Sequence, residues 1–329
     1  MKYTNQSGKT LLATAIATIL VGASGVANAD YTIDQSGGGV HIGLVTQAGA
    51  ANSTGAIVQE GAVGHSATID QGGQAGFISS ITQTGDDAAN TASIVQKIVN
   101  PDSGEAHIIQ DGASLIAEID SRGDPASGAS SNILSIDQQG EASSAAIKTR
   151  RSDGVVATVE QAGMGQTAEI DVKDSSGIEA SVSQSDAYAV GNSATITSVN
   201  GSVDSAASIT QVDQTNTATV AFDAADTADV EIDQSGETST AAVSVSASGG
   251  VVAVTQAGGS NSVTADIENA STGSTLTLSQ EGVGNTIEAT LSETVDSTLT
   301  IEQSDDDHFA KGELDRSTGV TASIVQSGG

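Results

Sequence analysis

Apolar and polar residues alternate with a period of two around a recurring glutamine. Two positions before each of sixteen glutamines stands Ile, Val or Leu, and the position three before is mostly Ser or Thr. Two positions after the glutamine stands Gly in twelve of the sixteen cases. This alternation predicts a strand with one buried face, and the Gly predicts a turn beyond it. The glutamine and the aliphatic residue should therefore share the buried face.

The glutamines recur at two intervals, twelve to fourteen residues over 30–110 and mostly 22 to 24 residues over 111–329. The predicted structural glutamine ladder comprises Gln35, Gln47, Gln59, Gln71, Gln83, Gln96, Gln110, Gln138, Gln161, Gln184, Gln211, Gln234, Gln256, Gln280, Gln303 and Gln326. The predicted aliphatic core includes Ile33, Ile57, Ile69, Ile81, Ile94, Ile136, Ile209, Ile232, Ile301 and Ile324.

A second alternating trio without glutamine accounts for the longer interval. It begins seven residues after a glutamine, as at Ala168, Ile170 and Val172. The unit is then strand–turn–strand–turn, about 23 residues long, and neighbouring units must stack to bury their inner faces. We expect an all-β fold, an uncapped β-solenoid of about a dozen coils that is amyloid-like when assembled, with 30–329 as one domain. Two stretches, 100–132 and 305–318, break the pattern and should form loops or imperfect coils.

Other fold classes fit less well. No 3.6-residue apolar periodicity is present, and Gly, Ser and Thr at this density are poor helix formers. Low aromatic content and high net charge favour disorder, but the aliphatic residues keep their register along the whole chain. Disorder of the free monomer before assembly remains an open alternative.

The N-terminal residues have the form of a secretory signal peptide. Lys2 and Lys9 precede an apolar stretch at 11–21, and Ala27-Asn28-Ala29 is an A-x-A cleavage sequence. We expect 1–29 to be removed and the chain to be secreted through the Sec pathway. An uncleaved membrane anchor is the alternative.

The charge balance is strongly acidic. The formal net charge is −31, and loss of Lys2 and Lys9 would leave 8 basic against 41 acidic residues, or −33. Nucleic acid is therefore not an expected partner, because phosphate binding needs clustered Lys and Arg. The acidic surface should keep monomers apart and could bind divalent cations. We expect assembly to be faster at low pH, or with salt or calcium, since each reduces this repulsion.

The chain offers little chemistry for catalysis. It has no cysteine, and its four histidines have no metal-ligand spacing. No catalytic triad or phosphate-binding loop is recognisable, so we expect no enzyme activity, no cofactor and no metal site. Lys148, Arg150 and Arg151 form the one basic cluster, to which the sequence assigns no role.

The repeats resemble those of the curlin family, whose outline is Ser-x5-Gln-x-Gly-x2-Asn-x-Ala-x3-Gln. Matching copies begin at Gln256, with Gly258 and Asn261, and at Gln280, with Gly282 and Asn285. The resemblance spans 30–329, although this chain has about twice the usual number of repeats and often lacks the Asn or the second Gln. The glycine- and asparagine-rich leader of the major curlin subunit is also missing.

The resemblance implies a secreted subunit of extracellular curli-like fibres for adhesion and biofilm matrix. Its implied partners are further copies of itself in a head-to-tail homopolymer, a nucleator subunit and an outer-membrane export pore. The residues leave one alternative open, a non-polymerising extracellular solenoid with an ice- or surface-binding face. Thr275/Thr277 and Thr298/Thr300 are fragments of the Thr-x-Thr array that such a face needs.

Overall fold

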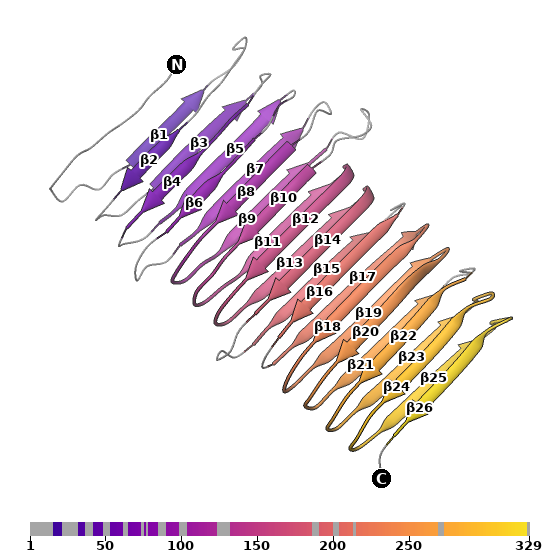
Figure 1. Cartoon of the computed structure of the whole chain (residues 1–329). Helices are drawn as coiled ribbons and strands as arrows, with labels where there is room; N and C mark the ends of the chain where they lie inside the picture. Colours follow the sequence, from indigo (N-terminus) through magenta and orange to yellow (C-terminus); the bar gives the residue numbers. More distant parts are fainter. Residues whose placement is uncertain are drawn as a thin grey trace. The chain divides into compact units, whose positions relative to one another are not determined.

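The computed structural model of the chain describes residues 16–21, 32–36, 42–48, 53–61, 65–73, 76, 78–84, 90–98, 104–123, 132–185, 191–199, 204–212, 215–268 and 273–327. Every regular element within these ranges is a β-strand (Figure 1). The chain divides into two compact units, 1–162 and 163–329, which are described one at a time.

In the first unit the strands alternate between two parallel sheets. Sheet A contains β1 (Ile16–Val21), β3 (Ile42–Ala48), β5 (Ala67–Gly73), β7 (Ala92–Ile98), β9 (Ala117–Arg122) and β11 (Ala145–Arg150). Sheet B contains β2 (Ile33–Ser36), β4 (Ile57–Glu60), β6 (Ile81–Gln83), β8 (Gly104–Ile109), β10 (Asn132–Asp137) and β12 (Asp153–Gln161).

The second unit repeats this arrangement. Its odd-numbered strands are β13 (Thr167–Lys173), β15 (Ser193–Val199), β17 (Thr217–Ala225), β19 (Thr240–Ala247), β21 (Ser262–Glu268), β23 (Thr286–Ser292) and β25 (Phe309–Asp315). Its even-numbered strands are β14 (Ser176–Gln184), β16 (Ser205–Gln211), β18 (Ala228–Gln234), β20 (Gly250–Gln256), β22 (Thr275–Gln280), β24 (Thr298–Gln303) and β26 (Thr321–Gln326).

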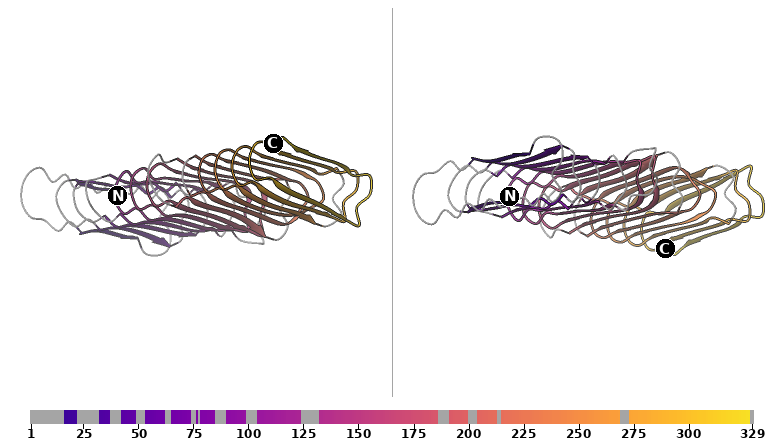
Figure 2. Two further views of the ribbon diagram at one scale, coloured as in Figure 1. Left: turned by 90° about the horizontal axis from the view of Figure 1, so that it is seen from below. Right: turned by 90° about the horizontal axis from the view of Figure 1, so that it is seen from above.

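The register places equivalent residues of successive coils side by side. In sheet B, Ile57 pairs with Ile81, and in sheet A, Val220 pairs with Val243. Within each unit the chain crosses from one sheet to the other and back, and the two sheets enclose a thin interior (Figure 2). This is the expected all-β solenoid. Glutamines twelve residues apart, such as Gln59 and Gln71, therefore lie in opposite sheets.

The interior is built from small and branched aliphatic side chains. Nine of the ten predicted core residues, all but Ile324, are at most 3% exposed. Ile324 was predicted to be core but is 49% exposed, because β26 is the last strand of its sheet and no coil covers its inner face. Ile324 pairs with the buried Ile301 and so takes the inner position of its strand as predicted, but its side chain is not buried.

The two stretches expected to be irregular contain regular strands in their described parts. Residues 104–109 and 117–122 form β8 and β9, and 309–315 form β25, which pairs in parallel with β23 over seven residues. The sequence did not predict β25 because Gly312 takes an inner position where an aliphatic residue is expected, between the charged Lys311 and Glu313. The strand still alternates between inner and outer positions, since Gly312 pairs with the buried Ala289. Pro101 and Pro125 lie outside the described residues.

The predicted signal segment contributes one strand. β1 pairs in parallel with β3, with Ile16 opposite Ile42 and Val21 opposite Gln47. The sequence did not lead us to expect a strand here, and the predicted cleavage sequence lies outside the described residues. In the part of the chain that the structure describes, no helix has the length and apolar character needed to cross a membrane.

Candidate functional site: the glutamine ladder and its ends

The sheet B glutamines of the first unit form a hydrogen-bonded ladder. In every step, Nε2 of one glutamine donates to Oε1 of the glutamine in the next strand of the sheet. The donor–acceptor distances are 2.8 Å from Gln35 to Gln59, 2.6 Å from Gln59 to Gln83, and 2.7 Å from Gln83 to Gln110, Gln110 to Gln138 and Gln138 to Gln161. The ladder thus has a direction, with donors facing the C-terminal coils.

The second unit contains a ladder with the same direction. The distances are 2.7 Å from Gln184 to Gln211 and from Gln211 to Gln234, 2.6 Å from Gln234 to Gln256, 2.8 Å from Gln256 to Gln280, and 3.2 Å from Gln280 to Gln303. All of these amides are buried, where an unpaired polar group costs about 1–3 kcal/mol. In sheet B the ladder is therefore a polar part of the core, as the sequence predicted for these glutamines.

Sheet A carries a short glutamine column, but its described amides do not form the predicted ladder. Gln71 Oε1 accepts from Ser79 Oγ, Gln96 Nε2 donates to the same Oγ, and Gln71 Nε2 and Gln96 Oε1 are buried without a partner. Gln47 pairs with Gln71 and Gln71 with Gln96, but the next positions in that column are Ser121 and Thr149. The side chain of Gln47 lies outside the described residues. In the second unit the corresponding positions are mostly apolar: Val172, Ser198, Phe222, Val245, Ile267 and Leu291. The same inner position thus accepts a glutamine column or an apolar column.

A second buried polar column runs along the turns that precede the sheet A strands. Asn192 Nδ2 donates to Asn216 Oδ1 at 2.9 Å, and Asn261 Nδ2 lies 3.3 Å from Asn285 Oδ1. In the first unit the side chains of His65 and Asn90 are 2.7 Å apart in the same kind of position. The curlin-like Asn positions were visible in the sequence, but their stacking was not, because the Asn is often replaced.

Both ends of the ladder leave an amide atom without a partner. Gln35 Oε1, in β2, is buried and accepts no hydrogen bond, and Gln303 Nε2, in β24, donates none. The hydrogen-bonded ladder therefore ends in an unused acceptor on Gln35 and an unused donor on Gln303, and Gln326 in β26, which was predicted to belong to it, is exposed beside Gln303.

The final coil also exposes residues that earlier coils bury. Leu314 in β25 is 44% exposed, in the column where Leu291 is fully buried. Ile324 in β26 follows the buried Ile301 in the same way. Each inner position of this coil has a covered counterpart one coil earlier, so a further coil of the same kind would fit on it.

Carboxylates occur in neighbouring strands on the outer faces. Asp137 pairs with Glu160. Partial burial raises the pKa of the Asp137 carboxyl, and so do the charge of Glu160 and, more weakly, that of Asp111. A hydrogen bond from Gln139 acts in the opposite direction. Partial burial, and then Glu268, raise the pKa of Asp266 in β21. These two carboxyls lose stabilising hydration when the fold forms.

No group of three or more potential metal-ligating side chains occurs among the residues that the structure describes. His107 lies on the outer face of β8 and His308 contacts Asn285, whereas His41 lies outside the described residues. No protein-family model, curated protein or solved structure matches the chain.

Proposed function

We propose that this chain is a secreted structural subunit that assembles head to tail into extracellular curli-like amyloid fibres for adhesion and biofilm matrix. The observation that supports this most is the directed glutamine ladder, with an unpaired acceptor on Gln35 at one end and an unpaired donor on Gln303 at the other. Placing one copy on another would bring Gln326 beside Gln35 of the next copy. Two new bonds, from Gln303 Nε2 to Gln326 and from Gln326 Nε2 to Gln35 Oε1, would then continue the ladder across the junction.

The strand edges support the same contact. β26 has no partner strand on its outer side in the described chain, and neither does β2 (Figure 1). Open strand edges template the addition of further chains, and natural proteins that stay monomeric usually protect them. A contact between two different ends of one molecule repeats without closing, and so produces a fibre.

Removal of the signal segment would alter the N-terminal end. β1 covers the edge of β3 in sheet A, so cleavage after Ala29 would uncover that edge while leaving β2 in place. At a junction between mature copies, sheet B would then be continuous from β26 to β2. Sheet A would have one open position between β25 and β3, the position that β1 occupies here.

The other parts of this proposal rest on the resemblance to curlins. It supplies the nucleator subunit, the outer-membrane export pore and the cell-surface location. Divalent cations on the acidic surface would lower the repulsion between copies.

The test is thioflavin fluorescence with electron microscopy on purified 30–329, incubated dilute and unstirred. We expect fibrils that seed fresh protein. The variant Leu314→Lys/Ile324→Lys, which places inward charges on the last coil, should stay folded and fail to elongate seeds. A persistently monomeric, β-rich wild type would refute the proposal.

One observation favours the alternative binding module. Six successive outer positions of sheet A in the second unit carry hydroxyls, in the column Thr167, Ser193, Thr217, Thr240, Ser262 and Thr286. In sheet B, Thr275/Thr277 lie directly beside Thr298/Thr300. Such a regular hydroxyl lattice suits ice or another ordered surface, and ice-recrystallisation inhibition by the monomer is its test.

A further inference from the structure

Basic side chains, scarce in this chain, gather on the outer face of sheet A in the first unit. Lys97 in β7 pairs with Arg122 in β9, and Arg122 pairs with Arg150 in β11. We call these three residues the basic stripe. Lys148 and Arg151 flank it, so five of the ten Lys and Arg residues of a chain with net charge −31 lie in this region.

The carboxylates of the first unit neutralise the basic stripe only in part. Lys97 Nζ lies 3.3 Å from Asp70, with both side chains exposed, and exposed pairs of this kind are weak. Arg122 pairs with Asp120 on its own strand. Arg150 and Arg151 form no ion pair with any described residue. Like charges side by side in a sheet repel, so this arrangement destabilises the isolated chain and favours an anionic partner.

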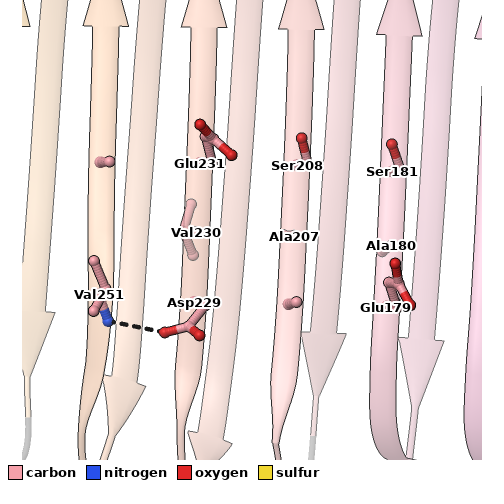
Figure 3. A pocket seen from close by; sticks show the side chains of 11 residues that line it. Glu179, Ala180, Ser181, Ala207, Ser208, Asp229, Val230, Glu231 and Val251 are labelled. Carbon is pink, nitrogen blue, oxygen red and sulfur yellow. Dashed lines mark hydrogen bonds between the residues drawn. The ribbon is translucent and has the colours of Figure 1, made fainter.

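A complementary surface lies on sheet B in the second unit. Glu179 in β14, Ala206 in β16 and Asp229 in β18 are in register, with Ser181, Ser208 and Glu231 beside them. Because β16 carries short side chains between strands that carry carboxylates, the face is hollowed there, with a volume of about 530 Å³. We call these six residues the acidic groove, and none of the residues that line the hollow is basic (Figure 3).

Figure 3 shows the carboxylates of Glu179 on one side of the hollow and of Asp229 and Glu231 on the other, with Ser208 between them. The Asp229 carboxylate accepts a hydrogen bond of 3.3 Å from the backbone N–H of Val251, which holds it at the groove wall. The arrangement across three strands is acid, small residue, acid.

We propose that the basic stripe of one copy binds the acidic groove of a second copy, joining solenoids side by side. The spacings agree, because both surfaces repeat at the strand separation of about 4.8 Å. Lys97 and Arg150 are two strands apart, as are Glu179 and Asp229. Arg122, between the two cations, would lie over Ala206 and Ser208, where the short side chains leave room for it.

A second copy is favoured over other polyanions by this match of pitch and by the overall charge. Two chains of net charge −31 repel in most side-by-side arrangements. Two copies attract only in an arrangement that brings the basic stripe of one to an acidic face of the other. The acidic groove is such a face, and its carboxylates have the same strand spacing as the cations of the stripe. Both surfaces lie on the sides of the solenoid, so this contact does not depend on the proposed growth at its ends.

The test is sedimentation velocity on the unassembled chain at low and high salt, roughly 20 and 500 mM. We expect salt-sensitive self-association of the wild type. Arg122→Glu/Arg150→Glu should weaken it by about tenfold or more, and so should Glu179→Arg/Asp229→Arg. An equimolar mixture of the two variants should associate again, because the unchanged groove of the stripe variant meets the unchanged stripe of the groove variant, and the two reversed surfaces also attract each other.

The matched control is Glu288→Arg/Glu302→Arg, which makes the same charge change as the groove variant away from the groove and should keep wild-type association. Failure of the mixture to associate, or equal loss in the control, would overturn the proposal. So would binding of a sulfated polysaccharide such as heparin through Arg150 without any self-association of the chain. Fibril elongation by thioflavin should be unchanged in the stripe variant, which separates this contact from end-to-end growth.

Discussion

Replacing Gln234 by Leu tests how the ladder stabilises the fold. Gln234 Oε1 accepts from Gln211 at 2.7 Å, and its Nε2 donates to Gln256 at 2.6 Å. The substitution would leave one donor and one acceptor buried without partners. At about 1–3 kcal/mol for each, the free energy of unfolding should fall by about 2–6 kcal/mol.

The triple variant Gln211→Leu/Gln234→Leu/Gln256→Leu gives a sharper prediction. It also breaks one bond at each end, because Gln184 Nε2 loses the Gln211 acceptor and Gln280 Oε1 loses the Gln256 donor. Its cost should therefore be close to that of the single variant rather than three times as large. In sheet A the equivalent inner position holds apolar side chains, among them Val245, Ile267 and Leu291.

The measurement is urea unfolding of freshly dissolved, unassembled protein, followed by circular dichroism. Thr255→Ala, an outward change in the strand that carries Gln256, is the control and should change stability by less than about 0.5 kcal/mol. A triple variant destabilised three times as much as the single one would refute the interpretation of the ladder as a chain of mutually dependent bonds.

Three further predictions concern turns, charge and packing. Gly259 has φ +120°, and a Cβ there would collide with the Glu237 carbonyl of the preceding coil. Gly259→Ala should therefore lower the free energy of unfolding, measured in urea, by about 1–3 kcal/mol. Gly258→Ala, where a Cβ would meet no atom, should not lower it. The pKa of Asp137 is raised in the folded state, so the ionised carboxylate destabilises the fold and its protonation favours folding. Asp137→Asn, which removes the charge, should therefore raise the melting temperature at pH 7. It should leave the melting temperature unchanged near pH 3, below the ordinary aspartate pKa of about 3.9, where the carboxyl is already protonated. Ile301→Ala should cost about 2–5 kcal/mol in the same unfolding assay, because this side chain is fully buried.

The sequence was sufficient to predict the fold because one register repeats along the chain. In each coil the glutamine and the aliphatic residue two positions before it mark the inward-facing side of the strand. A coil in which the pattern is lost therefore does not affect the assignment of the others. The prediction failed at Ile324, since burial depends on a neighbouring coil that the local pattern cannot supply. It also failed at β25, where Lys311 and Glu313 take outer positions beside Gly312 on the inner face.

The surface features were less accessible. The basic stripe joins Lys97, Arg122 and Arg150, which lie 25 and 28 residues apart in a part of the chain where the interval is irregular. The acidic groove forms because the short side chains of Ala206 and Ser208 lie in the strand between those that carry Glu179 and Asp229. These strands are far apart in the sequence. Both surfaces become visible only when the register is known.

The most direct test of the proposed head-to-tail contact is a disulfide across the junction. The chain has no cysteine, so introduced ones are unambiguous. If Gln326 pairs with Gln35 of the next copy, the outward residues Val325 and Asp34 lie side by side, within the Cα separation of about 4.4–6.8 Å that a disulfide spans. Fibres of Val325→Cys/Asp34→Cys, oxidised and run on a denaturing gel, should give a ladder of covalent multimers, and each single variant should give none beyond a dimer. Fibres that form normally but yield no such ladder would contradict growth through these ends.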